Sequence, residues 1–276
     1  MRRALYFLAG LVAALGLFAT YCLFDARRDP LVRRAELPLS DWPRGAAPIR
    51  VLLISDIHIG SAAMGPERLE RVVAQINALR PDLVLIAGDF VAGHAPDTSA
   101  QIGAPMVKPL SHLHARLGVV AVIGNHDWWT GADPVRALLA AAHIRILENA
   151  AMPVGPLALG GMGDLYDEHA DLDATLRAMR AIPGAHVLLT HSPDIAPQLP
   201  RDAPLLLAGH THCGQVVLPI YGPLASVTRY GERYRCGIRR EGARTVIVTA
   251  GLGTSGGPFR FGAPPDLWLL TMGPAR

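Results

Sequence analysis

Five short polar stretches carry side chains that are suited to binding divalent metal ions. They are Asp56-Ile57-His58, Gly88-Asp89, Gly124-Asn125-His126-Asp127, His191 and Gly209-His210-Thr211-His212. Carboxylate, imidazole and amide-oxygen ligands suit Mn, Fe, Zn or Ni, and the lack of a thiolate among them argues against structural zinc or an iron–sulfur cluster. The residue types therefore predict a site that holds two divalent cations side by side.

Each polar stretch follows a short apolar run that is typical of a buried strand. The runs are Ile49–Ile54, Leu83–Ala87, Val119–Ile123, Val187–Thr190 and Leu205–Ala208. Such runs indicate a sheet that is covered on both faces, and ligands just beyond the carboxyl ends of its strands converge on one crevice. One stretch alone is weak, because Gly, Asn and Asp are ordinary turn residues. Five in succession favour a single site.

Taken in order, the five stretches resemble the signature of the calcineurin-like metallophosphoesterases, over roughly residues 49–270. His191-Ser192-Pro193-Asp194, Gln215 and Gly251-Leu252-Gly253-Thr254-Ser255 are further similar to a bacterial subgroup with an N-terminal membrane segment. Cys213 departs from the pattern, since many members of that subgroup have Gly there. A cysteine beside a ligand is able to bind metal or to be oxidised, but we expect its side chain to point elsewhere.

The resemblance implies a role for each polar side chain. Asp56, His58 and His212 would hold the first metal, Asn125, His191 and His210 the second, and Asp89 would bridge both. A metal-bridging hydroxide would attack phosphorus, and His126 would act as general acid from outside the coordination shell. Alternate residues of an extended chain project to one side, which would bring each Asp-x-His or His-x-His pair onto the metals.

The implied fold is α/β, a four-layer metallophosphatase sandwich in which two central mixed β-sheets are flanked by helices. The sequence supports it with further patterns between and after the predicted strands. Helical spacing occurs in Glu67–Leu79, Asp133–Ala142 and Asp171–Met179, and strand-like runs occur in Thr245–Thr249 and Leu267–Thr271.

Three features outside the predicted ligands bear on substrate choice. Arg260, in a Gly-rich loop, is expected to reach a phosphate, unless the loop merely sets turns. Trp128 either flanks the leaving group or packs beneath it. The segment 221–240 interleaves tyrosines with arginines. It is either a surface for phosphate or for a membrane interface, or a charged hairpin with Gly231 at its turn.

The N-terminal segment predicts a membrane anchor. Ala4–Phe24 has no charged residue over 21 positions, which as a helix spans about 31 Å, the thickness of a bilayer core. A cleaved signal peptide is the alternative, but the apolar run is long and no Ala-x-Ala site closes it. Arginines flank it on both sides, namely Arg2 and Arg3 before it and Arg27, Arg28, Arg33 and Arg34 after it. The two flanks nearly balance, so they do not predict which side the remainder occupies.

The chain therefore divides into a transmembrane anchor over residues 1–25, a proline-containing linker over 26–47 and a catalytic domain over 48–276. Cys22, Cys213 and Cys236 show no pairing pattern, so no disulfide framework is implied and no redox compartment follows. His94 and five other histidines match no motif and are expected to be structural or surface residues. A net charge of +3 is too small to indicate a nucleic-acid partner.

The leading prediction is a hydrolase in the inner membrane with a single membrane pass. It would use two divalent metal ions, Mn, Fe, Zn or Ni, on a phosphodiester or pyrophosphate that is lipid-linked or close to the membrane. One alternative is an exported phosphodiesterase or phosphomonoesterase acting on soluble or wall-derived phosphate. The other is a non-enzymatic metal-binding membrane module, which is disfavoured because every ligand position and His126 are present.

Overall fold

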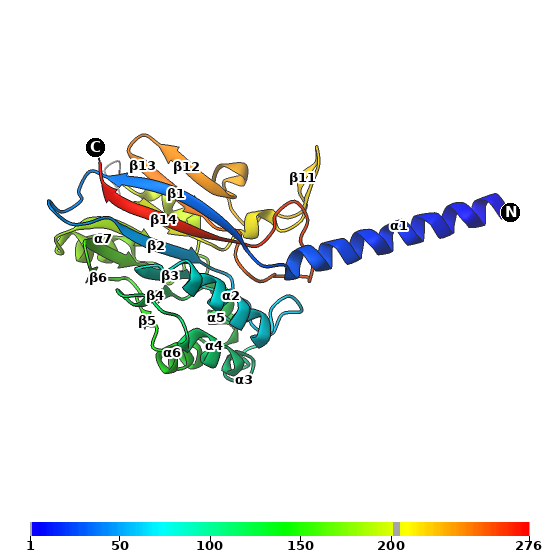
Figure 1. Cartoon of the computed structure of the whole chain (residues 1–276), viewed down its shortest axis with the longest axis horizontal. Helices are drawn as coiled ribbons and strands as arrows, with labels where there is room; N and C mark the ends of the chain where they lie inside the picture. Colours follow the sequence, from blue (N-terminus) through cyan, green and yellow to red (C-terminus); the bar gives the residue numbers. More distant parts are fainter. Residues whose placement is uncertain (1, 201–204, 276) are drawn as a thin grey trace.

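The computed structural model describes residues 2–200 and 205–275, which form an α/β domain with a long helix extending from one end (Figure 1). Two six-stranded sheets lie at its centre. The first has the order β1 (Leu31–Leu39), β14 (Asp266–Pro274), β2 (Ile49–Ile54), β3 (Leu83–Ala87), β4 (Val119–Val122) and β5 (Arg145–Ile146). All its neighbours pair in parallel except β14 with β2, which are antiparallel.

The second sheet is also mixed. Its order is β12 (Gly237–Glu241), β13 (Arg244–Val248), β9 (Leu205–Ala208), β8 (Ala185–Leu189), β7 (Leu157–Gly161) and β6 (Ala150–Val154). The four central strands are parallel, and the two outer pairs are antiparallel. Two mixed sheets confirm the predicted metallophosphatase architecture.

Helices cover the outer faces of both sheets. They are α2 (Pro66–Ala78), α3 (Ser99–Gly103), η1 (Ala104–Met106), α4 (Val107–Ser111), α5 (Asn125–Thr130) and α6 (Ala132–Ala141) on the first sheet, and α7 (Leu172–Arg180) and η2 (Pro193–Gln198) on the second. Between the sheets, side chains such as Leu53, Leu85, Leu189 and Leu207 form a continuous buried cluster. Alternate residues of each strand therefore face the shared core or a helix layer, which explains the unbroken apolar runs.

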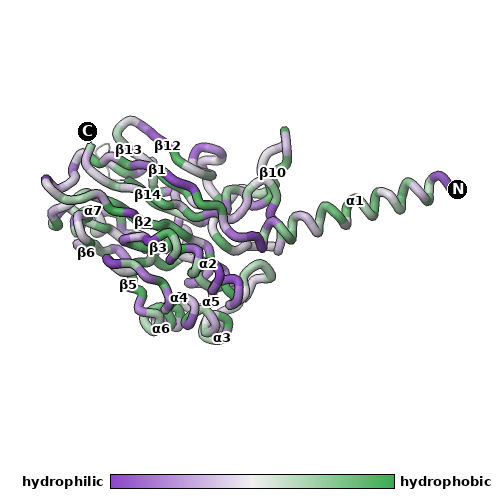
Figure 2. Tube along the Cα trace, viewed as in Figure 1, coloured by the Kyte–Doolittle hydropathy of each residue, from purple (hydrophilic) through white to green (hydrophobic). Residues whose placement is uncertain are grey.

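The first helix, α1 (Arg2–Arg27), is long and apolar enough to cross a membrane by length and composition. It is mostly hydrophobic along its length, with hydrophilic residues at its N-terminal end (Figure 2). Its side chains are exposed up to about residue 21, whereas Cys22, Asp25 and Ala26 are buried against the domain. The predicted helical segment is thus present and is attached to the domain by its last turns.

The segment expected to be a linker differs from the prediction. Within residues 26–47, β1 pairs with β14 over nine residues and forms the edge of the first sheet. Leu37 is buried in the core, and Arg33 forms an ion pair with the fully buried Asp266 at 2.5 Å. Prolines and charges suggested a linker, but an edge strand tolerates both.

Several short elements were not predicted. They are β5, the β6–β7 hairpin, β10 (Val217–Leu218) with β11 (Gly222–Pro223), η3 (His212–Gly214) and η4 (Gly231–Tyr234). The segment 221–240 is therefore not one charged hairpin. Gly231 begins η4, and β12 pairs with β13.

Candidate metal centre

The predicted ligands lie together where the two sheets present the carboxyl ends of their central strands. Asp56 and His58 follow β2, Asp89 follows β3, and Asn125 is the first residue of α5, after β4. The second sheet contributes His191 after β8, and His210 and His212 after β9. All seven residues are buried, the most accessible being His212 at 7%. Loops from both sheets thus converge on one crevice, as the sequence predicted.

One group of ligand atoms involves Asp56, His58, His212 and Asp89. His58 Nε2 lies 3.2 Å from His212 Nε2 and 3.5 Å from Asp89 Oδ2. Asp56 Oδ1 lies 3.5 Å from His212 Nε2 and 4.0 Å from His58 Nε2. Four ligand atoms from three loops therefore lie close together.

A second group contains Asn125, His191, His210 and, again, Asp89. His191 Nε2 lies 3.2 Å from Asp89 Oδ2, 3.0 Å from Asn125 Oδ1 and 3.1 Å from His210 Nδ1. Asp89 Oδ2 is thus near both groups. The side chains therefore form two adjacent groups that share Asp89.

The chemistry of the second group fits a cation. His191 Nδ1 lies 2.6 Å from the carbonyl oxygen of Ala87 and can act there only as a donor. In a neutral ring Nε2 is then an acceptor, yet it faces a carboxylate oxygen of Asp89 and the amide oxygen of Asn125. Acceptors that face one another at about 3 Å repel unless a proton or a metal ion lies between them.

The ionisation of three of the four candidate ligand histidines is also suited to ligation, which requires neutral imidazole. Burial lowers the pKa of His58 and of His210 to about 3, and it places the pKa of His212 well below its ordinary value. For His191, burial lowers the pKa, but the carboxylates of Asp89 and Asp56 outweigh it and raise the pKa well above its ordinary value. That negative potential is what a divalent cation would neutralise.

The ligand loops hold an unusual backbone conformation. Asp56, His58, Asp89, His210 and His212 have φ between 48° and 69°, in the left-handed region. Such residues cost on the order of 1–3 kcal/mol each and cluster at functional sites. The predicted pairs therefore converge through left-handed turns, and the expectation of an extended chain with alternating side chains was wrong for Asp56/His58 and His210/His212.

Two glycines of the motifs are required by close approach of the backbone. A Cβ at Gly124 would collide with the carboxylate of Asp89, and a Cβ at Gly209 would collide with Ser55 and lie 2.6 Å from Asp56 Oδ2. Only glycine lets these loops pass so near the ligands.

Asp127 fixes the loops of Asp89 and Asn125 relative to each other. Its carboxylate accepts hydrogen bonds from the backbone N–H groups of Asp89, Phe90, Val91 and Gly124, at 2.8–3.1 Å. The side chain is fully buried. The sequence placed Asp127 within a motif, but its role as a bridge between two loops was not predicted.

His126 lies at the rim of the centre. Its Nδ1 lies 2.8 Å from the carbonyl oxygen of Gly93, and its Nε2 lies 3.1 Å from Ser255 Oγ. One of its ring nitrogens also lies close enough to His58 and Asp89 for the three side chains to bind one metal ion. Because Nδ1 is fixed as the donor to a carbonyl, Nε2, which contacts the hydroxyl of Ser255, is the nitrogen that can exchange a proton at the pocket. Burial lowers the pKa of His126.

A pocket of about 290 Å³ opens over the centre. Besides Asp89, Asn125, His126, His210 and His212, its lining includes His94, Trp129, Tyr166, Ala225, Val227 and Ser255. The His94 ring is stacked on Trp129, with centroids 4.9 Å apart, and lies 4.7 Å from His126. His94 matches no sequence motif and was expected to be a structural or surface residue, and no local pattern marks Tyr166 as a pocket residue. Only the fold brings these loops to the pocket.

Two residues expected at the substrate lie elsewhere. Trp128 stacks on His169 at 3.5 Å and beneath the guanidinium of Arg136, whereas its neighbour Trp129 lines the pocket. Arg260 is fully buried and donates to the carbonyl oxygens of Gly253, Ala263 and Ala250 at 2.7–3.1 Å.

A further contact of Arg260 explains its position. Its Nη2 lies 3.3 Å from His212 Nδ1, on the side of the ring away from the ligand atoms. Burial lowers the pKa of Arg260 to about 10, which still leaves the guanidinium charged at neutral pH. This placement does not fit the expected contact with a substrate phosphate. Arg260 instead holds the ring of a ligand from behind.

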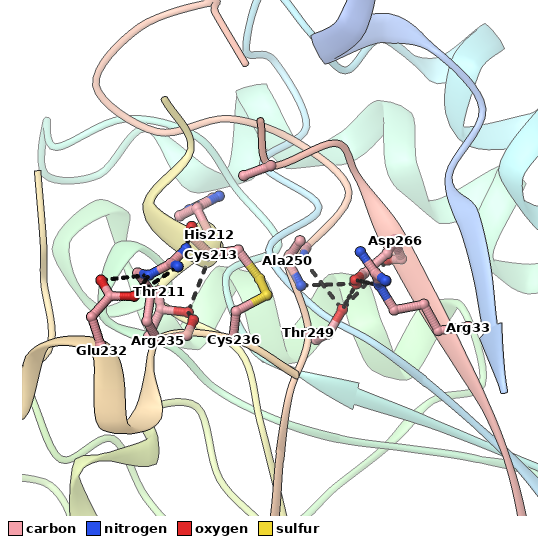
Figure 3. Close-up of a disulfide and its surroundings, with 12 residues drawn as sticks. Arg33, Thr211, His212, Cys213, Glu232, Arg235, Cys236, Thr249, Ala250 and Asp266 are labelled. Carbon is pink, nitrogen blue, oxygen red and sulfur yellow. Dashed lines mark hydrogen bonds and ion pairs between the residues drawn. A yellow bond between two sulfur atoms is a disulfide. The ribbon is translucent and has the colours of Figure 1, made fainter. Parts of the chain in front are cut away.

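Cys213 and Cys236 form a disulfide, with Cα atoms 4.8 Å apart (Figure 3). The cysteine spacing implied no disulfide framework, and the fold nevertheless pairs these two residues, so that the Cys213 side chain points to Cys236. Arg235 Nη1 donates to the carbonyl oxygen of Cys213, and Thr211 Oγ1 donates to that of Arg235. Spacing alone gave no pairing signal, because the turn that returns Cys236 to the ligand loop is visible only in the fold.

Comparison with known proteins identifies the family of the chain. Residues 49–214 match the family model of the calcineurin-like phosphoesterases, so the chain belongs to that family. It is similar to the uncharacterized metallophosphoesterase YkuE of Bacillus subtilis, with 31% identity over 83% of this chain and 81% of that protein.

A transmembrane protein with metallophosphoesterase domain from Danio rerio is 30% identical over 92% of this chain. The chain spans only 60% of the length of that relative. Among solved structures, a dimetal phosphatase from Danio rerio superposes with a TM-score of 0.48 at 12% identity, covering 75% of this chain and 88% of the other.

Proposed function

We propose that the protein is a hydrolase of phosphoric esters that depends on two divalent metal ions. Asp56, His58 and His212 would hold one ion, Asn125, His191 and His210 the other, and Asp89 would bridge them. The observation that carries the proposal is the position of Asp89 Oδ2, which lies 3.5 Å from His58 Nε2 in one ligand group and 3.2 Å from His191 Nε2 in the other.

Two ions held in this way would supply a nucleophile at neutral pH and neutralise charge on the phosphoryl oxygens. The protein contributes the positions of the groups around them. We assign His126 the role of general acid, because its Nε2 faces the pocket while Nδ1 is held by Gly93. Tyr166 and Trp129 line the pocket and offer apolar surface to whatever the phosphate carries.

We further propose a phosphodiester or pyrophosphate substrate on a lipid or close to a membrane. Support comes from α1, which is long and apolar enough to span a bilayer, and from the similarity to the Danio rerio relative, which is named as a transmembrane protein. An exported enzyme that acts on soluble phosphate remains the competing function, and cleavage after α1 would distinguish it.

The test uses full-length protein in detergent, loaded in turn with Mn²⁺, Fe²⁺, Ni²⁺ and Zn²⁺. We expect bis(4-nitrophenyl) phosphate to be hydrolysed with at least one of these ions, and not after chelation. Asp89→Asn should abolish turnover, whereas Asp173→Asn, an exposed aspartate on α7, should retain it. No turnover with any ion, or equal turnover in Asp89→Asn, contradicts the proposal. Mass spectrometry of the mature protein reports whether α1 is retained.

A further inference from the structure

The helix α1 enters the domain at the end that carries the metal centre. β1 begins four residues after α1, with Leu31 beside Asp266 at the start of β14. Because β14 and β2 are antiparallel, that end is also the carboxyl end of β2, from which the ligands Asp56 and His58 follow. The same edge of the sheet therefore receives the helix and presents the pocket.

Direct contacts fix α1 beside the pocket loops. The backbone N–H of Arg260 donates to the carbonyl oxygen of Cys22 at 3.1 Å. The ring of Phe261 lies 5.0 Å from that of Phe18 and 6.0 Å from that of Tyr21. Arg68 also donates to the carbonyl oxygens of Arg27, the last residue of α1, and of Arg28, which follows it.

The contact between Phe261 and Phe18 lies within the uncharged part of α1. Phe18 lies six residues before the end of the uncharged stretch Ala4–Phe24, which is about 9 Å along a helix axis. If that stretch fills the bilayer core, Phe261 packs on a part of α1 that is inside the membrane boundary. The loop that carries Phe261 must then reach the headgroup region or lie below it.

The exposed apolar side chains are concentrated in the same place. Outside α1, the large hydrophobic residues that are exposed in residues 28–200 and 205–275 are Tyr166, Ile220, Tyr221, Leu224, Val227, Tyr230 and Phe259. We call the last six the apolar rim. Five of its members fall within eleven residues that include β11, and the hairpin of β10 and β11 lies at the α1 end of the domain (Figure 1). The hairpin is joined to the helix contact, because Val217 N–H donates to the carbonyl oxygen of Phe261.

Ile220 is the most unusual residue of the rim. It is fully exposed and has φ of 69°. A β-branched residue is strained in this conformation, which glycine or asparagine adopts at much lower cost. Neither folding nor solubility explains an isoleucine here. A partner that receives the side chain does.

The rim also borders the pocket. Ala225 and Val227 line the cavity above the metal centre, as does Tyr166. Ser255 and Gly256, from the loop that continues to Phe259, line it as well. A molecule that approaches the centre from the rim would thus pass between apolar side chains.

We propose that the apolar rim enters the interfacial region of the bilayer that α1 spans, so that the pocket receives phosphoesters whose acyl chains remain in the membrane. Aromatic residues favour this region, and burial of apolar surface supplies the binding energy. The substrate class rests on the proposed function, whereas the membrane contact does not require hydrolysis.

The contact is tested by fluorescence of the full-length protein in vesicles of phosphatidylethanolamine and phosphatidylglycerol with brominated chains. Tyr221→Trp adds a reporter to the rim. Ala243→Trp adds one at the exposed β12–β13 turn, at the opposite end from the centre. After subtraction of the wild-type signal from the four native tryptophans, bromine should quench the rim reporter and leave the turn reporter unchanged. Equal quenching of the two overturns the proposal.

Turnover tests the substrate class separately. Ile220→Asn should leave the thermal midpoint unchanged or raise it, and should leave hydrolysis of bis(4-nitrophenyl) phosphate in detergent unchanged. Hydrolysis of a phosphodiester lipid in vesicles should fall roughly tenfold, as expected for loss of one inserted side chain, with Ala243→Asn as the control. Unchanged lipid turnover in Ile220→Asn overturns the proposed entry route. Quenching of the rim without hydrolysis of any phosphoester supports the membrane contact and contradicts the proposed function.

The disulfide indicates, independently of the apolar rim, which side of the membrane the domain occupies. Disulfides persist in oxidising compartments and are rare in the cytosol. Cys213 is adjacent to the ligand His212, so the bond between Cys213 and Cys236 tethers a loop of the metal centre. The arginines that flank α1 leave the orientation undecided. We infer that the domain lies on the oxidising side of the membrane, with the N-terminal end of α1 in the cytoplasm.

Thiol trapping and protease access test this orientation for the full-length chain in a Gram-negative host. Maleimide-polyethylene glycol, added to denatured cells, should modify one of the three cysteines before reduction and all three after it. Protease added to spheroplasts should digest the domain. Three reactive cysteines without reduction, or a domain that is digested only in inverted vesicles, overturns the inference.

Discussion

At the scale of residues, the clustering of the seven candidate ligands could be predicted from sequence, because each stretch follows a recognisable buried strand. Their backbone conformation could not be. Left-handed φ values at Asp56, Asp89 and His210 depend on contacts between loops that are far apart in the chain. The same limit applies to His94 and Tyr166, which reach the pocket through the fold without a local motif.

We predict that His126→Ala retains both metal ions but slows turnover by about 10²–10⁴-fold, the usual contribution of a general acid. The loss should be largest for diesters with poor leaving groups, because these need the proton most. His112→Ala, at an exposed histidine far from the motifs, is the matched control. A full rate on an unactivated diester would show that another group donates the proton.

Replacement of Arg260 tests its support of His212. Arg260→Met would leave several buried carbonyl oxygens without donors, and each such loss costs about 1–3 kcal/mol. We expect thermal unfolding of the metal-loaded protein at a clearly lower temperature, together with weaker binding of one of the two ions in a chelator competition. Arg244→Met, which also removes an arginine that donates to carbonyl oxygens, but on η2, should destabilise the fold without this selective loss. Equal effects of both variants on the two ions would contradict a role behind His212.

At the scale of elements, the strands with continuous apolar runs could be predicted almost to the residue. β2, β3 and β9 have the bounds that the sequence indicated. The edge strand β1 and the pair of β10 and β11 could not be, since edge strands contain prolines and charges and two-residue strands leave no periodicity. The helices α2, α6 and α7 followed from their helical spacing.

The disulfide gives a prediction at this scale. Cys213→Ser with Cys236→Ser should lower the free energy of unfolding by about 3 kcal/mol, the order expected for a loop of this length. Urea denaturation with and without a reductant measures the effect. The reductant should weaken the wild type and leave the double variant unchanged. Equal stability of the two proteins under oxidising conditions would contradict a bonded pair.

At the scale of the whole molecule, the family fold was predictable, but the boundary between the anchor and the domain was not. Residues 26–47 contain β1, which covers the edge of β14, and Arg33, which pairs with buried Asp266. The folded unit therefore includes residues well before position 48. The strand β1 follows directly after α1, and the last turns of α1 therefore lie beside the metal centre.

Two fragments test this boundary. Residues 30–276 keep β1 and should be monomeric and cooperative in thermal unfolding. Residues 48–276 expose the edge of β14 and leave Asp266 without its arginine, so we expect aggregation or a lower melting temperature. Size-exclusion chromatography and calorimetry distinguish the two. Identical behaviour would show that β1 adds nothing to the fold.

The most direct measurement is the metal content of the full-length protein, by inductively coupled plasma mass spectrometry after loading with each of the four metals. We expect two ions per chain for at least one metal and none in Asp89→Asn, since the bridging carboxylate serves both ligand groups. No more than one ion with every metal, or two ions retained in Asp89→Asn, would contradict it.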